Sequence, residues 1–294
     1  MSTLVNDTTF QLSDTGIILN DDLLGNVPFV DVETVTGLDS APFRQTKRDH
    51  EGVDGGFMDA EFEQGRDISI QGILYSNGNP LEPFLDSLKA NWAPSTTLIP
   101  LYILVNDVGL RVIFVKPLGV QYDWDALRRL GMAAVTFTCY AEDPRIYSGS
   151  LQSVIIPLGA FVLTGFGFNL GFSFSFGGVS TTSDGQFVYN TGNRPAPVIL
   201  TITGPVVNPI ILNDTTGSTM TFNITLGVGE TLVIDTQYHT VRLNGTTNRR
   251  TVMTTPGWFM LAPAPIAPSG GNFIRFRATS GTGTLTVAYR ASWR

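Results

Sequence analysis

Cysteine is almost absent from this 294-residue sequence, which contains only Cys139. A single cysteine cannot form an internal disulfide, so the fold does not depend on an oxidising compartment. Cys139 lies on the apolar face of a predicted strand, and we interpret it as a small buried side chain rather than a nucleophile. The first residues also lack the basic region and the apolar core of a signal peptide, so we expect none.

Charge is scarce as well. Charged residues make up 15% of the sequence, and 25 acids against 18 bases give a formal net charge of -7. We expect no sequence-specific nucleic-acid binding, because that requires clustered Lys and Arg to neutralise phosphates. An acidic surface is still compatible with a channel through which DNA slides, since it keeps DNA from sticking to the wall.

No charged residue occurs between Arg145 and Asp184. An apolar run of ~18 residues would normally predict a transmembrane helix. Here, however, large apolar residues alternate strictly with small or polar ones, and this period of two predicts a strand and no membrane span. The alternating residues are Phe166, Phe168, Leu170, Phe172, Phe174 and Phe176. They either fill a sandwich core, which is the favoured interpretation, or form a contact between subunits.

Motifs that carry chemistry are missing. The sequence contains no G-x-S-x-G elbow, P-loop, H-E-x-x-H pattern or cysteine pair. Glu230 and Asp235 are placed on opposite faces of one predicted strand, which does not make a catalytic pair. His50 stands among acids in Thr46–Gly65, but the spacing fits no metal-ligand pattern, so we interpret this stretch as a solvated loop. We therefore predict no enzyme activity, no cofactor and no metal site.

Strands dominate the prediction, with one helix. The best helix lies near residues 80–92: Asn79 is the candidate N-cap, Pro80 the first helical residue, and an apolar stripe follows. The stripe consists of Leu81, Phe84, Leu85, Leu88 and Trp92. Predicted strands of the first half are Gly16–Asn20, Val27–Thr36, Arg66–Tyr75, Leu98–Leu104, Gly109–Pro117, Val120–Trp124 and Met132–Ala141.

The second half consists of short strands, each ended by Gly, Asn, Asp or Pro, which predicts an antiparallel sandwich. These strands are Gly185–Asn190, Val198–Ile202, Thr219–Leu226, Glu230–Asp235, Thr240–Leu243, Asn248–Val252, Phe273–Arg277 and Thr284–Tyr289. The fold class is therefore mainly β, with two domains. Residues 1–148 form a β-rich domain with one covering helix, and residues 149–294 form an antiparallel β-sandwich.

The predicted domain boundary follows Asp143 and Pro144. Proline has no N–H for a strand ladder and extends the residue before it, so the preceding strand must stop or turn there. Arg145 and Tyr147 come next, and both carry large hydrogen-bonding groups. We interpret these four residues as a structural domain junction, and we expect Arg145 to pair with an acid or with backbone carbonyls where the domains meet.

Some aromatic residues of the second half are candidate glycan contacts, because aromatic rings stack on sugars. The candidates are Tyr238 and Trp258. The alternative is that both are core or rim aromatics of the sandwich, and this alternative is favoured.

Short motifs in both halves occur in an order that resembles distal tail proteins of siphoviruses, the long-tailed bacteriophages, which are also called minor tail proteins. In the first half the motifs are Gly65–Gly72 (GRDISIQG), the Leu85–Leu88 helix and Ala141–Tyr147 (AEDPRIY). In the second half they are Gly192–Pro195, Ile202–Pro205, Gly229–Asp235, Val241–Gly245 and Tyr289–Trp293. One segment departs from the pattern, because Leu261–Gly271 is longer and richer in proline than the expected turn.

The resemblance implies a hexameric ring at the tail tip that joins the tail tube to the baseplate hub and surrounds the DNA channel. The implied partners are further copies of the chain, the tail tube protein, the tail-hub or tail-associated protein and the tape-measure protein. The implied location is the virion, after assembly in the host cytoplasm. The C-terminal domain would be an accessory sandwich like those of galectins and carbohydrate modules. The alternative function is therefore a carbohydrate-binding module that contacts a host surface glycan.

Overall fold

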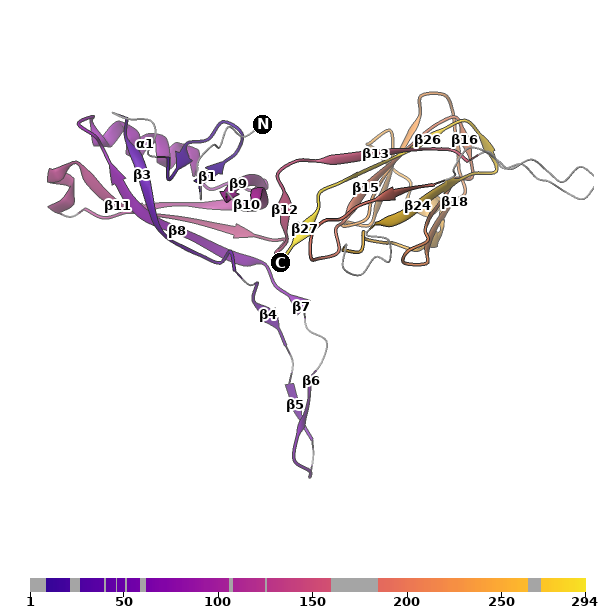
Figure 1. Cartoon of the computed structure of the whole chain (residues 1–294), viewed down its shortest axis with the longest axis horizontal. Helices are drawn as coiled ribbons and strands as arrows, with labels where there is room; N and C mark the ends of the chain where they lie inside the picture. Colours follow the sequence, from indigo (N-terminus) through magenta and orange to yellow (C-terminus); the bar gives the residue numbers. More distant parts are fainter. Residues whose placement is uncertain are drawn as a thin grey trace, which may run out of the picture. The chain divides into compact units, whose positions relative to one another are not determined.

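The structure is a computed structural model and is mainly β, as predicted (Figure 1). It divides into two compact units, Met1–Gly149 with Arg294, and Ser150–Trp293. The residues that it describes are 9–21, 27–39, 41–45, 47–50, 52–58, 62–105, 108–124, 126–159, 185–263 and 271–294.

An antiparallel sheet forms the body of the first unit, in the order β2-β1-β9-β10-β11-β8-β3, with β12 paired to β10. Its strands are β1 (Thr9–Leu12), β2 (Ile18–Leu19), β3 (Phe29–Thr36), β8 (Arg66–Tyr75), β9 (Ile99–Val105), β10 (Gly109–Tyr122), β11 (Met132–Ala141) and β12 (Ile146–Ser148). The alternation in β8 and β11 gives each strand one buried face, as predicted. Gly72 of β8 is required because a Cβ there would lie 2.1 Å from the Asp31 carbonyl oxygen.

Helix α1 (Leu81–Asn91) provides apolar cover for this sheet, which confirms the predicted helix. Leu85 and Leu88 are buried in the same core as the sheet residues, and the Trp92 ring packs 4.8 Å from that of Phe137. The predicted cap is wrong: Pro80 occupies the N-cap position and makes no side-chain cap bond. Asn79 instead donates its amide to the Ser76 carbonyl, which closes the preceding turn.

Two predictions for the first unit need correction. The strands predicted at Gly109–Pro117 and Val120–Trp124 form the single strand β10, whose register shifts between Pro117 and Gly119. A bulge is where a sheet tolerates proline, because no ladder hydrogen bond is needed there. The stretch predicted as a loop, Thr46–Gly65, contains short paired strands instead. Within it β5 (Lys47–Asp49) pairs with β6 (Gly56–Met58), and β7 (Phe62–Glu63) pairs with β4 (Phe43–Arg44), which lies just before the stretch.

The second unit is an antiparallel sandwich, as predicted. One sheet has the order β13-β26-β15-β20-β21-β22, and the other β14-β24-β17-β18-β23. The first sheet contains β13 (Gln152–Pro157), β15 (Val198–Thr203), β20 (Thr231–Asp235), β21 (Thr240–Leu243), β22 (Thr247–Asn248) and β26 (Thr284–Tyr289). The second contains β14 (Gly185–Val188), β17 (Ile210–Asn213), β18 (Ser218–Phe222), β23 (Met253–Pro256) and β24 (Asn272–Arg277).

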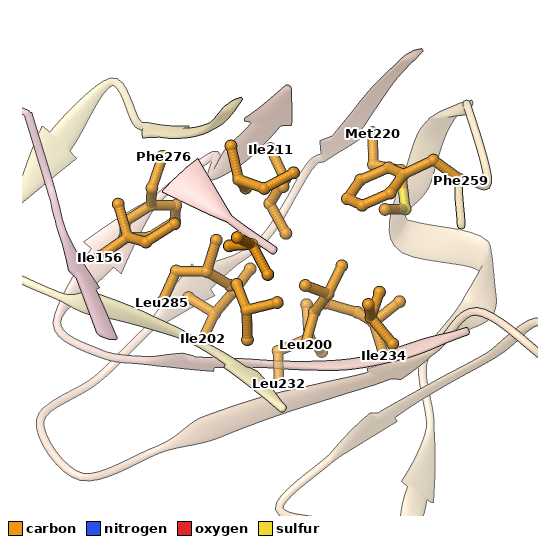
Figure 2. Packing of buried hydrophobic residues seen from close by; sticks show 14 of the residues in the cluster. Ile156, Leu200, Ile202, Ile211, Met220, Leu232, Ile234, Phe259, Phe276 and Leu285 are labelled. Atoms are coloured by element: carbon orange, nitrogen blue, oxygen red, sulfur yellow. The ribbon is translucent and has the colours of Figure 1, made fainter. Parts of the chain in front are cut away.

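Residues from both sheets form one apolar core. Figure 2 shows Ile211, Met220 and Phe276 facing Leu200, Leu232 and Ile234 of the other sheet. All are essentially inaccessible to solvent. Burying each such side chain stabilises the fold by about 1.5–3 kcal/mol, so the inward face of every strand contributes.

Several strand bounds in this unit differ from the prediction. Thr219–Leu226 is divided into β18 and β19 (Thr225–Leu226), and Asn248–Val252 ends in a 3-10 turn at Arg250–Val252 rather than as a strand. Strands β16 (Val206–Val207) and β17 were not predicted. Strands β19, β16 and β25 (Ser280–Gly281) pair as a small third sheet. The alternating phenylalanine run lies outside the described residues.

None of the helices in the described part of the chain is long and apolar enough to cross a membrane.

Candidate structural site at the end of strand β11

Asp143 organises the predicted junction residues. Its Oδ1 accepts hydrogen bonds from the Arg145 backbone N–H and from Arg145 Nη1, each at 3.1 Å. Its Oδ2 accepts the hydroxyl of Tyr147 at 2.5 Å. The Asp143 and Arg145 side chains are only 14% and 17% exposed, so the ion pair is well shielded from water. The acid that pairs with Arg145 therefore stands two residues earlier, inside the first unit.

Pro144 is held by a residue that the sequence analysis did not single out. Arg66, the first residue of β8, is 1% exposed. Its guanidinium donates to the carbonyl oxygens of Gly37, at 3.3 Å, Leu38, at 3.1 Å, and Pro144. Arginine suits this position because it offers five donors in a rigid fork. The only hint in the sequence was that Arg66, a charged residue, falls on the face of β8 where every second residue is otherwise uncharged.

Burial shapes the electrostatics of this region. It raises the pKa of the Tyr147 hydroxyl far above its ordinary value, and the negative charge of Asp143 adds to the shift. Burial likewise raises the pKa of the Cys139 thiol to about 12, with Asp67 contributing. Both groups are therefore neutral at physiological pH. The Cys139 side chain is buried in the core of the first unit, where it packs as a small apolar group.

The predicted glycan contacts, Tyr238 and Trp258, behave differently from one another. Tyr238 is 63% exposed in the turn that follows β20. Trp258 is partly buried; the His239 ring stacks on it at 4.6 Å and 20°, and the Arg250 guanidinium carbon lies 5.8 Å from its centroid. The stacked imidazole occupies an indole face that a sugar would need.

The other polar candidates serve local structure. Glu230 Oε2 accepts the Gly227 backbone N–H at 2.7 Å, and Asp235 Oδ1 accepts those of Gln237 and Tyr238 at 2.8 and 3.0 Å. Each carboxylate thus caps a turn. Among the described residues, no group of His, Cys, Asp and Glu side chains could hold a metal ion.

A buried asparagine network in the second unit was also missed by the sequence analysis. Asn190 donates to the carbonyls of Arg194 and Leu261 and accepts the backbone N–H groups of Gly192 and Ser292. Asn272 exchanges two 2.9 Å hydrogen bonds with the Ala262 backbone and accepts the Asn213 amide. Each of the three asparagines has no exposed surface. A single asparagine at the end of a predicted strand is usually interpreted as a turn residue. Nothing in the sequence therefore marked these three asparagines as buried.

Residues 191–293 match the family model of the siphovirus-type tail component, C-terminal domain. The SPP1 Dit protein has a similar structure, and that structure is described as a paradigm of the hub adsorption apparatus in phages that infect Gram-positive bacteria. The TM-score is 0.64 at 14% identity, covering 97% of this chain and 99% of the other. A chain of the phage P2 baseplate, in its activated conformation with Ca, matches at TM-score 0.51 and 11% identity, covering 97% and 98%. No curated protein sequence matches the chain.

The two comparisons agree with the geometry. The family model covers the sandwich from residue 191 onward, which leaves out β13, β14 and Asn190, and the structural match extends through the β8–β11 sheet. The chain therefore has the fold of the SPP1 Dit protein, and its residues 191–293 match the siphovirus-type tail component, C-terminal domain.

Proposed function

We propose that this protein is a non-catalytic building block of a phage tail tip, where copies of it form a ring, hexameric as the resemblance implies. The ring would join the tail tube to the baseplate hub and surround the DNA channel. The observation that carries the proposal is the likeness to SPP1 Dit over 97% of the chain, in both units. In this proposal the first unit builds the ring and the sandwich is accessory to it.

The first unit has features that suit a ring. A closed ring of more than two copies needs two different, complementary surfaces on each subunit. The sheet of the first unit ends in two unlike strands, β2 with two residues and β3 with eight. Among the described residues β8 is the only strand that pairs with β3. The other edge of β3 is bonded to Asn20 at Val30 and Val32, and β3 exposes Asp31 and Glu33. Exposed acids discourage unspecific strand pairing at the rest of this edge and leave it for a matched neighbour.

The overall charge fits a DNA passage. A formal net charge of -7 gives a surface that repels phosphates, which favours passage over binding. The proposed partners are further copies of the chain, the tail tube protein, the tail-hub or tail-associated protein and the tape-measure protein. The proposed location is the tail tip of the virion, after assembly in the host cytoplasm.

The proposal is tested by the mass and shape of the assembly. Light scattering of the purified full chain at increasing concentration should reveal a defined multiple of the 31.8 kDa subunit, and electron microscopy should show a ring with a central opening. Antibody labelling of virions should mark the tail tip. A protein that stays monomeric at high concentration and is missing from virions would overturn the proposal.

A further inference from the structure

We infer that Arg294 is a clasp that holds together the two strands at the root of an exposed ribbon of the first unit. The ribbon consists of the β4–β7 pair, which is its root, followed by the β5–β6 pair (Figure 1). Arg294 belongs to the first unit, so the clasp lies within one compact unit. The inference concerns how a single chain holds its own ribbon, and it does not depend on the ring proposed above.

The strand pairing at the root of the ribbon is short. Two residue pairs form it, Phe43 with Glu63 and Arg44 with Phe62. Phe43 and Phe62 are 41% and 58% exposed, so the pairing is accompanied by little apolar burial. A two-stranded ribbon without further cover is marginally stable in water. Side chains from outside the β4–β7 pair must therefore contribute to holding it closed.

The Arg294 side chain contacts both strands of this pair. Its Nε lies 3.1 Å from Oε1 of Glu63 in β7, and its guanidinium carbon lies 6.0 Å from the ring centroid of Phe43 in β4. Because Phe43 and Glu63 are direct partners in the register, one guanidinium bridges a single cross-strand pair. Arginine suits this place, since its planar group can pair with a carboxylate and also lie against an aromatic ring.

The two partners of the ion pair differ in burial. The Glu63 side chain is 8% exposed, whereas that of Arg294 is 69% exposed. A fully exposed ion pair contributes little to stability, but a carboxylate that is shielded from water is destabilised when it loses a cation. Opening the root separates Phe43 from Glu63, and Arg294 can then keep only one of its two contacts. The clasp therefore opposes opening of the root.

A second arginine joins the two sides of the ribbon where it leaves the sheet. The Arg66 guanidinium donates to the carbonyl oxygens of Gly37 and Leu38, which connects the chain that enters the ribbon to the chain that leaves it. Between this arginine and the clasp, the Gln64 backbone N–H donates to the Pro42 carbonyl at 2.8 Å. The clasp thus extends a series of bridges outward along the ribbon.

The clasp determines how the outer part of the ribbon is presented. Lys47 and Arg48 of β5 are exposed, and β5 and β6 are attached to the sheet through the root. A closed root limits the positions that β5 and β6 can take, and a segment with few positions loses less conformational entropy when another surface contacts it. Arg294 is therefore a positioning residue for the ribbon.

The test is hydrogen exchange of the full chain, followed at the Gln64 backbone N–H. This amide exchanges when the root opens, so its rate reports the open fraction. We expect Arg294→Ala to raise the rate by about fivefold and to leave exchange in β8 and β11 unchanged. Arg294→Lys, which keeps the charge without the planar group, should give an intermediate rate. Arg129→Ala is the matched control, because Arg129 is an exposed arginine of the same unit outside the ribbon, and it should change nothing.

A second variant isolates the ion pair. Glu63→Gln keeps the size of the side chain and removes its charge, so it should also raise the Gln64 rate. Because the two residues act as one pair, Arg294→Ala combined with Glu63→Gln should exchange no faster than the faster single variant. All variants are compared at a concentration where light scattering gives them the same mass.

Three outcomes would overturn the inference. The first is an unchanged Gln64 rate in Arg294→Ala. The second is that the effects of Arg294→Ala and Glu63→Gln multiply, as they do for independent sites. The third is that exchange in β8 and β11 accelerates as much as that of Gln64, because Arg294 would then stabilise the whole unit rather than hold the ribbon.

Discussion

The buried guanidinium of Arg66 donates a hydrogen bond to the carbonyl oxygen of Pro144, 78 positions later in the chain. Together with its bonds to Gly37 and Leu38, this contact ties the start of β8 to two loops. A buried charged group that loses its partners is costly, and so are carbonyls that lose their donor. The stability of the fold therefore requires an arginine side chain at position 66.

We expect Arg66→Ala to lower the free energy of unfolding by about 3 kcal/mol or more, because the buried Pro144 carbonyl and two half-buried carbonyls lose their donor and a cavity remains. Urea unfolding of the full chain measures it. Arg129→Ala is the matched control, because Arg129 is an exposed arginine of the same unit and should change stability by less than about 0.5 kcal/mol. Equal losses for the two variants would contradict the role of Arg66.

The junction network predicts an order of effects. Asp143 is the acceptor for both Arg145 and the Tyr147 hydroxyl, whereas loss of Arg145, which also interacts with Tyr147, leaves that acceptor in place. Asp143→Ala should therefore cost about 2 kcal/mol, since it strands a buried tyrosine hydroxyl, and Arg145→Ala about 1 kcal/mol or less. Thermal and urea unfolding of both variants checks the order, and a reversed order would show that Tyr147 does not rely on Asp143.

The buried thiol predicts a dependence of stability on alkaline pH. Burial raises the pKa of Cys139 from 9.0 to about 12, so the unfolded chain loses the thiol proton first. The stability due to this group is complete below pH 9 and is lost as pH rises toward 12, by up to about 1.4 kcal/mol per pH unit. Urea unfolding of the wild type between pH 7 and 10.5 should thus decline more steeply than that of Cys139→Ala. Parallel profiles would mean that the thiol titrates normally.

The asparagine network predicts a contrast between two similar substitutions. Asn190 uses both its amide nitrogen and its oxygen, so Asn190→Asp removes two donors and buries a charge. We expect a loss of about 3 kcal/mol or more. Asn248 is exposed and uses only its oxygen, which accepts the Arg250 backbone N–H at 3.0 Å, so Asn248→Asp should be nearly neutral. Similar unfolding midpoints for both variants would show that the donors of Asn190 carry no stability.

Much of the fold could be predicted from patterns among neighbouring residues. The alternation in Arg66–Tyr75 and Met132–Ala141 predicted β8 and β11 to the residue, because a half-buried strand must place apolar side chains at every second position. The apolar stripe predicted α1 for the same reason at a period of 3.6. The cap was wrong because several residues near the helix start can serve, and the turn at Ser76 competes for Asn79.

Other elements depended on partners elsewhere in the chain. Pro117 suggested the end of a strand, but β11 continues to pair on both sides of the bulge, so β10 runs through. The charged Thr46–Gly65 stretch reads as a loop because its strands are exposed and lack a buried face to impose alternation.

By itself, the sequence determined the strand periodicity, the single covering helix, the sandwich of the second half and the absence of an internal disulfide, since each follows from neighbouring residues or from composition. Only the tertiary structure decided which carbonyls Arg66 binds, that Asn190 joins Leu261 to Ser292, and that Phe187 and Phe273 meet on an open face. These contacts join residues tens of positions apart, and their energy comes from burial and hydrogen-bond satisfaction that exist only once the sheets have packed.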